Sequence, residues 1–398
     1  MIGGMTNSYV LQLYLGNNLI GNIPSMLEHF SIVQDINSLL PTCRIKLTDS
    51  GDGLNHLAPL DNNFNTIRVS LKQSMHSEIT NEYSFAIFRR YPKPKLFDAS
   101  CILNVPNVFT PQYCRGFGKK NARQQRYRGT VKQIIEDIAV YDLGFTNTEV
   151  STSLNYNNNL LQPNITNAEL LVNLAQTLQG AEGESGYYCF ATVAEGKKIF
   201  HFKHINEILN QIPKYKFYVS PDMVDGHLPI IDYKIYDNYR LFKNMGLKQQ
   251  AYGYFDYATG TYVDTNVDYT GLHPLAQYHM MNANEPNDSA NTPLGRNTDF
   301  TEDFVGRVGG DYYKRLNGLT KMWITTYGLG DIKPSDIVSI LFGDAMVSGQ
   351  LNDYLYQGDW LVEKVVHLIG QTHITKLLLS RNGVDTTKET TLLRAIKR

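Results

Sequence analysis

Few residues in this sequence have both the type and the spacing that enzyme chemistry requires. Cys189 and His201 could serve as a nucleophile and its general base. Cys189, however, lies in the apolar run Tyr188-Cys189-Phe190, and a cysteine in such surroundings usually behaves as a buried hydrophobic residue. We therefore predict no nucleophilic catalysis at this position.

Two histidine pairs are candidates for a metal site. His201 with His204, or His273 with His279, could hold an ion in principle. Neither pair has an acidic residue or a cysteine at ligand spacing, and the HExxH pattern is absent. We interpret these imidazoles as ordinary strand or loop residues and predict no metal.

Motifs for nucleotide binding and hydrolysis are also missing. The phosphate loop GxxxxGK followed by Ser or Thr is absent, and so is the GxSxG elbow. Glu136 and Asp137 at a helix start complement the helix dipole better than they suit acid–base work. We predict that the protein is not an enzyme and has no catalytic or cofactor-binding residues. A cell-wall hydrolase stays open as an alternative, because glycosidase carboxylates can lie anywhere in a sequence; clearing of a peptidoglycan suspension would reveal it.

A basic segment at residues 115–128 has no acidic residue. Its six positive charges are Arg115, Lys119, Lys120, Arg123, Arg126 and Arg128. One interpretation is contact with a polyanion, which predicts salt-sensitive DNA binding that is lost when the six residues are neutralised. The other is a solvated linker or an interface loop that pairs with acidic residues of a neighbour. We favour the second, because the whole chain balances 37 Lys and Arg against 38 Asp and Glu.

Composition is that of a folded, β-rich protein. Of 398 residues, 42% are hydrophobic and 19% are charged, and the 26 tyrosines favour strands and protein interfaces. The cysteines show no CxxC or zinc-finger spacing, and we expect reduced thiols rather than one structural disulfide. No basic signal-peptide region is evident at the start, and no apolar run approaches the roughly 20 residues that span a bilayer.

The elements that would position any site are mostly strands. Residues 358–385 read as a β-hairpin around Gly370-Gln371-Thr372, closed by the turn-forming pair Asn382-Gly383. Both of its faces carry apolar residues, and a hairpin alone is only marginally stable, so it must complete a larger sheet or barrel. Alternating patterns in residues 8–71 and beyond predict an early meander or small barrel that ends near Arg128.

Between the two β-rich regions the pattern becomes helical. Thr130 can cap a helix that stops at Gly144, and Thr166 or Asn167 can cap a second helix that stops at Gly180. A two-strand hairpin then follows, from residues 187–193 and 198–202.

The order of these segments resembles that of phage baseplate central hub proteins, a group that includes the T-even phage hub, the late control D proteins and the hub half of type VI secretion spikes. The resemblance covers most of the chain and is carried by residues 128–139, 160–176, 186–202 and 358–383. Each segment is chemically unspecific, and the Tyr-rich stretch 252–315 does not align.

The resemblance implies a mainly β fold with an α+β part, in which two tube-type β-barrel domains flank an α+β module. The expected divisions are a first barrel at 1–128, the module at 129–214, a second barrel at 215–385 with the insertion at about 252–315, and a tail at 386–398.

The same resemblance implies a structural virion protein. We expect a homotrimeric ring at the phage tail baseplate, assembled in the host cytoplasm, that joins tail tube proteins to the central spike and other baseplate proteins and lets DNA pass through its lumen. Two similar barrels per chain would let three chains match sixfold symmetry. A tail tube or distal tail adaptor protein of the same barrel type is the alternative and predicts a hexamer.

Overall fold

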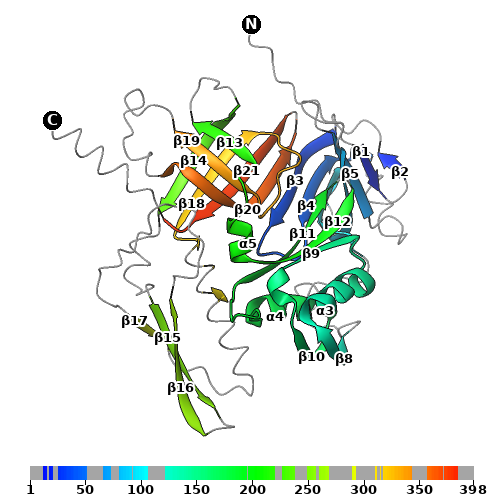
Figure 1. Cartoon of the computed structure of the whole chain (residues 1–398). Coiled ribbons are helices and arrows are strands. Elements are labelled where there is room, and N and C mark those ends of the chain that lie inside the picture. Colours follow the sequence, from blue (N-terminus) through cyan, green and yellow to red (C-terminus); the bar gives the residue numbers. More distant parts are fainter. Residues whose placement is uncertain are drawn as a thin grey trace, which may run out of the picture.

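We analysed a computed structural model of the chain. It describes residues 12–15, 18–20, 26–51, 66–72, 80–91, 93–105, 122–194, 196–219, 226–237, 249–256, 260–268, 289–292, 310–311, 314, 317–342, 356–370 and 372–383. Figure 1 shows a β-rich body with a helical module below it. The predicted fold class, mainly β with an α+β part, is confirmed. No helix among the described residues is long and apolar enough to span a membrane.

The late strands close into a six-stranded barrel. Its hydrogen-bonded order is β19-β13-β14-β18-β21-β20, and β20 pairs again with β19. The strands are β13 (Tyr215–Val219), β14 (Leu228–Asp237), β18 (Thr320–Tyr327), β19 (Ile337–Phe342), β20 (Gly358–Ile369) and β21 (His373–Arg381). The predicted closing hairpin is confirmed as β20–β21. Closure leaves no free strand edge within this ring.

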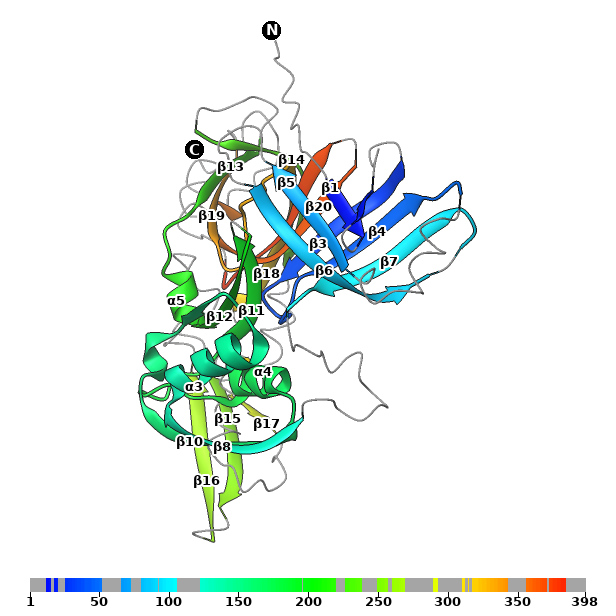
Figure 2. The ribbon, with the colours of Figure 1, turned by 90° about the vertical axis from the view of Figure 1, so that its right-hand side faces the viewer.

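The early strands form an antiparallel sheet beside this barrel. The sheet order is β3-β4-β7-β6-β5-β1-β2. The strands are β1 (Gln12–Leu15), β2 (Asn18–Ile20), β3 (Leu27–Asp35), β4 (Thr42–Thr48), β5 (Thr66–Lys72), β6 (Thr80–Arg90) and β7 (Leu96–Leu103). In Figure 1 and Figure 2 the sheet lies next to the late barrel.

The two β-units are not separate, which corrects one expectation. β3 pairs antiparallel with β20, so the early sheet and the late barrel form one continuous sheet. The early sheet ends at β2, and among the described strands β2 does not pair back with β3. Within the described residues, the late unit is therefore a closed barrel and the early unit is an open sheet. Alternation in a sequence reports which residues face a core, but it does not report which distant strand supplies the partner edge.

The helical module lies between the two units in the chain. Its helices are α3 (Val131–Asp137), which continues as the π-helix η2 (Ile138–Leu143), the 3₁₀ turn η3 (Thr152–Leu154), α4 (Asn167–Thr177) and α5 (Ile205–Leu209). Its strands are β8 (Arg123–Thr130), β9 (Asn147–Val150), β10 (Asn157–Ile165), β11 (Tyr187–Ala194) and β12 (Lys197–His204). β8 pairs with β10, β11 pairs with β12, and β9 adds to β12 in parallel.

Local helix signals in the module mostly hold. Thr130 caps α3, and Gly144 follows η2 in the left-handed region with φ of 85°. Thr166, rather than Asn167, caps α4 through a reciprocal capping box with Glu169. The predicted stop at Gly180 is wrong, because α4 ends at Thr177 and Leu178 is already extended.

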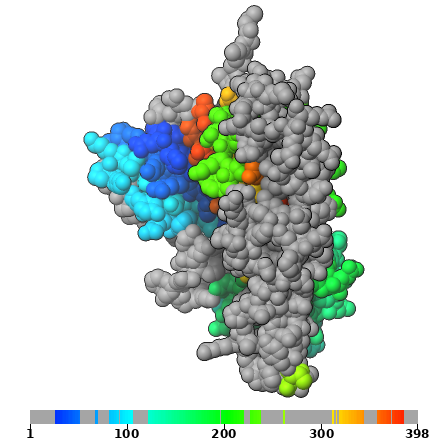
Figure 3. All heavy atoms as spheres, turned by 90° about the vertical axis from the view of Figure 1, so that its left-hand side faces the viewer, coloured from blue at the N-terminus to red at the C-terminus, as the bar shows by residue number. Residues whose placement is uncertain are grey.

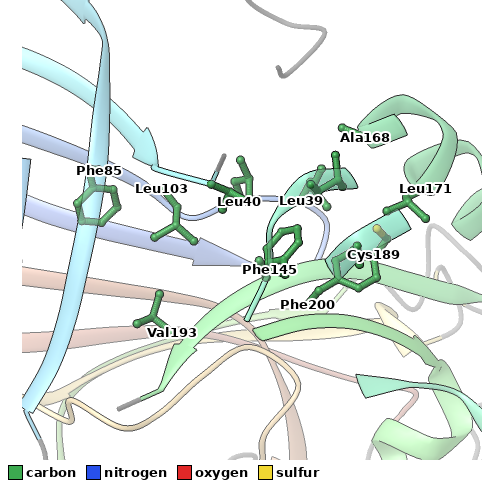
Figure 4. Packing of buried hydrophobic residues seen from close by; sticks show 14 of the residues in the cluster. Leu39, Leu40, Phe85, Leu103, Phe145, Ala168, Leu171, Cys189, Val193 and Phe200 are labelled. Atoms are coloured by element: carbon green, nitrogen blue, oxygen red, sulfur yellow. The ribbon is translucent and has the colours of Figure 1, made fainter. Parts of the chain in front are cut away.

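Hydrophobic burial follows two cores. The first joins the early sheet to the module, and Figure 4 shows Leu40 and Leu103 of the early region near Phe145 of the module. The second fills the late barrel around Trp360, which is fully buried. The early sheet therefore shares its core with the module, while the barrel has a core of its own. The domain division at residues 128, 214 and 385 stays a prediction.

Two sequence expectations concern the Tyr-rich stretch and the C-terminal tail. The Tyr-rich stretch contains β15 (Gln249–Asp256), β16 (Thr261–Asp268) and β17 (Ser289–Thr292), which form a three-stranded sheet. Elsewhere in that stretch the structure describes residues 260, 310, 311 and 314. The tail expected at 386–398 lies outside the described residues.

Candidate functional site

The pairing of β11 with β12 separates the first catalytic candidates. Cys189 lies opposite Phe202, and both residues belong to the early core. His201 lies opposite Phe190, one position along each strand, and therefore points to the other face of the sheet. Burial also raises the pKa of the Cys189 thiol. Cys189 and His201 do not form a nucleophile–base pair.

His201 instead joins a buried chain of hydrogen bonds. Its Nε2 lies 2.7 Å from Thr192 Oγ1, and its Nδ1 lies 3.2 Å from Glu149 Oε2. Phe190 stacks on the imidazole with ring centroids 4.7 Å apart. The order hydroxyl, imidazole, carboxylate resembles the hydrolase triad. Thr192 and His201 are both fully buried, however, so no substrate can reach the hydroxyl in this arrangement.

The pKa shifts of His201 and Glu149 favour a structural role for this hydrogen-bonded group. Burial lowers the pKa of His201, and Glu149 partly opposes that effect. The hydrogen bond from His201 holds the pKa of Glu149 below its ordinary value, with Lys203 contributing as well. Because Glu149 lies on β9 and His201 on β12, the contacts fix the parallel strand to its neighbour.

Glu149→Gln tests that role through pH. A carboxyl with a lowered folded pKa stabilises the fold above its unfolded pKa of about 4.3, and the stabilisation is lost as pH falls toward the folded value. We therefore expect the variant to be less stable than the wild type at pH 7, with the difference shrinking below about pH 4. Urea unfolding across this range measures it, and Glu136→Gln on the surface of α3 is the matched control. A pH-independent difference would contradict the ionic contribution.

The predicted histidine pairs do not form a metal site among the described residues. His204 accepts from the backbone of Asn206 to cap α5, and its Nε2 contacts Ser185 O at 2.8 Å. His201 and His204 are thus engaged in different hydrogen bonds, and His273 and His279 lie outside the described residues. Within the described ranges, no three His, Cys, Asp or Glu side chains group closely enough to hold a metal ion.

A second histidine pair, missed in the sequence, lies at one end of the late barrel. His367 Nδ1 is 3.1 Å from His373 Nε2, and both side chains are buried. Thr375 beside them accepts a hydrogen bond from the backbone of Leu329 at 2.9 Å. Burial lowers the pKa of both imidazoles, that of His373 to about 4, and His373 lowers that of His367 further. His367 lies opposite Thr375 and His373 lies opposite Ile369, so the two histidines are diagonal neighbours in the hairpin. The predicted hairpin could therefore have indicated the pair.

Half of the basic segment is visible on β8. Arg123, Arg126 and Arg128 are exposed, while Arg115, Lys119 and Lys120 lie outside the described residues. This half is therefore strand rather than linker. Arg123 forms an ion pair of 3.1 Å with Asp142 of the same chain, not with a neighbouring molecule.

The junction between β3 and β20 is the feature that organises the molecule. The two strands pair over six residues from Lys364↔Asp35 to Ile369↔Phe30, and the Lys364 and Asp35 side chains lie 2.8 Å apart. Glu363 sits at the β20 bulge, where its backbone oxygen accepts from Ile36 N at 2.8 Å and its carboxylate binds Lys321 at 2.7 Å. Figure 3 shows the early sheet and the late barrel abutting in the upper half of the molecule.

Two solved structures resemble the fold of this chain over nearly its whole length. A tail protein from Neisseria meningitidis MC58 aligns with a TM-score of 0.56 at 11% identity, covering 95% of this chain and 98% of that one. The 43 kDa tail protein of prophage MuSo2 from Shewanella oneidensis aligns with a TM-score of 0.56 at 9% identity, covering 95% and 100%. The chain has the fold of a phage tail protein. No protein-family model matches the sequence, and no curated protein matches it, so the tail-protein fold is recognised through structure alone.

Proposed function

We propose that this protein with a tail-protein fold is the central hub of a phage-type baseplate, a structural virion protein without catalytic activity. Three copies would form a ring that joins tail tube proteins to the central spike and other baseplate proteins. DNA would pass through the lumen. The ring would assemble in the host cytoplasm and remain in the virion. Two prophage and bacterial tail proteins of the same fold support this proposal.

The continuous sheet across β3 and β20 is the observation that carries the proposal. It joins two β-units side by side within one chain. A ring of three such chains would present six β-units, a closed barrel and an antiparallel sheet from each chain, and would offer six positions to a sixfold tube. A chain with one β-unit would need six copies for the same match.

Mass measurement tests the ring. Light scattering of the purified protein is expected to give three times the chain mass of 45.1 kDa, and negative-stain images should show rings with threefold symmetry. Six times the chain mass would favour the tail tube or adaptor alternative. A monomer that stays monomeric at high concentration and with tube partners would contradict both.

The ion pair at the β3–β20 junction offers a sharper prediction. Asp35→Lys places two lysines opposite each other, and we expect a loss of about 1 kcal/mol in stability and fewer rings. Asp35→Lys combined with Lys364→Asp restores an opposite-charge pair and should recover most of both losses. Equal defects in the single and double variants would show that the pair does not support the junction.

A further inference from the structure

Two cysteines face each other across neighbouring strands of the early sheet. Cys43 on β4 is the direct register partner of Cys101 on β7. Both side chains point into the early core, with exposed fractions of 3% and 0%. Both residues are free thiols in this structure.

The backbone geometry brings this pair near that of a disulfide. Leu103 N donates to Pro41 O at 2.9 Å, and Cys101 and Cys43 lie two residues further along each strand, so they occupy the same hydrogen-bonded type of position. Cα atoms at such positions are about 5.5 Å apart, and disulfides span about 4.4–6.8 Å. Opposed Cβ atoms lie about 4.5–5.5 Å apart, whereas disulfides prefer about 3.5–4.5 Å. Closing the bond therefore draws the strands together and leaves it strained.

Cys189 is a natural comparison within the same core. It is buried like the pair, but its register partner is Phe202, so no second sulfur lies opposite it. Burial alone thus does not distinguish Cys43 and Cys101; their mutual register does. A strained disulfide is also reduced more easily than a relaxed structural one.

We propose that Cys43 and Cys101 form a reversible redox site, at which a small neutral oxidant such as hydrogen peroxide closes a cross-strand disulfide between β4 and β7. One thiolate attacks a peroxide oxygen, the O–O bond breaks, and the departing hydroxide takes a proton to become water. The other thiolate then attacks the resulting sulfenic sulfur, the S–O bond breaks, and the leaving hydroxide takes the proton that the second thiol released to become water. The two sulfurs together lose two electrons, and one peroxide is reduced to two waters.

The pair's surroundings set how the site reacts. Burial raises the pKa of the Cys43 thiol, and the contact with Cys101 raises it further, so little reactive thiolate exists in the resting fold. Oxidation is therefore slow, and charged or bulky oxidants are excluded. The site stays a dithiol in a reducing cytosol and closes outside it. This chemistry is independent of the proposed ring.

Mass spectrometry of the folded full chain tests the proposal. The test uses the Cys114→Ser variant, in which this cysteine cannot form links between molecules. The folded variant is incubated with hydrogen peroxide, alkylated under denaturing conditions and digested. We expect a crosslinked peptide pair containing Cys43 and Cys101 and an alkylated Cys189. Excess dithiothreitol, which is small and neutral, should reopen the link. The same chain with Cys101→Ser should show no link at Cys43.

Three other results would overturn the proposal. Free alkylated Cys43 and Cys101 after prolonged oxidation would show that the strands do not approach closely enough. Sulfinic acid at either residue without a crosslink would show the same. A link that resists excess dithiothreitol in the folded protein would contradict the strained, reversible character. Circular dichroism before and after oxidation confirms that the measured protein is folded.

Discussion

Arg381→Met is expected to lower the free energy of unfolding by about 3–5 kcal/mol, because it removes two hydrogen bonds from a charged donor to buried carbonyl oxygens and the contact with the Trp360 ring. Arg381 is fully buried at the end of β21. Its Nη1 donates to Gln357 O at 2.7 Å, its Nε donates to Gly383 O, and its guanidinium lies 4.7 Å from the centre of the Trp360 ring.

These contacts hold together both ends of the hairpin. Gln357 precedes β20 and Gly383 follows β21, so a single side chain ties the start of one strand to the end of the other. Methionine approximates the volume of the arginine stem, which limits the contribution of a cavity to the loss. The carbonyl oxygens would remain buried without their donor, which is the costly part of the change.

Urea unfolding followed by tryptophan fluorescence measures the effect. The chain has two tryptophans, and Trp360 lies directly under the guanidinium. Lys376→Met is the matched control, because Lys376 is exposed on the same strand and should change stability by about 0.5 kcal/mol or less. A loss below 1 kcal/mol for Arg381→Met would show that the buried charge is not what holds the hairpin ends.

Acid is expected to destabilise the late barrel through His367 and His373. A histidine whose folded pKa is lowered favours the fold above its ordinary value of 6.5, and that advantage is lost as pH falls toward the folded value. For His373 this loss of stability occurs between pH 6.5 and about pH 4. A difference of this size corresponds to about 3 kcal/mol, and the pKa of His367 is lowered as well.

His373→Gln separates this contribution from the general effect of acid. The variant should lose less stability than the wild type between pH 7 and pH 4, by about 2–3 kcal/mol. Lys376→Met, at an exposed position of the same strand, is the matched control and should follow the wild-type curve. Fluorescence-detected urea unfolding at each pH supplies the comparison. Parallel curves for His373→Gln and the wild type would refute the assignment.

Close packing around His367 and His373 leaves the two imidazoles little room to move when they are protonated. A Cβ atom added to Gly328 would lie 2.2 Å from His373 Nδ1, so the imidazole packs directly on the glycine backbone. Within the described residues, His367 Nε2 has no hydrogen-bond partner. Protonation would therefore add charge where the ring cannot move to meet water.

Local physics made several elements predictable from the sequence. Thr130 and Thr166 cap helices because their hydroxyls accept from backbone amides three residues later, and Gly144 ends η2 because it adopts a positive φ easily. Short links made both the β11–β12 and the β20–β21 hairpins evident. The apolar neighbours of Cys189 predicted a buried thiol, and the structure buries it.

Weak or interrupted patterns explain the errors. Gly180 predicts a helix stop two residues too late, because the chain leaves the helix at Leu178. The Arg-rich end of the basic segment reads as linker because β8 has an almost wholly polar, exposed pattern. β15 and β16 lie where alternation is too irregular to mark a strand. In each case a partner strand or a packing surface supplies what the local sequence does not specify.

By itself, the sequence determined the class of the protein: strands early and late, a helical module between them, and the positions of caps and hairpin turns. These follow from interactions between residues a few positions apart. Only the tertiary structure decided that β20 pairs with β3, that the late strands close, and that Cys43 meets Cys101. Such contacts depend on which distant edges meet and in what register, and a residue pattern with a period of two is compatible with many partners.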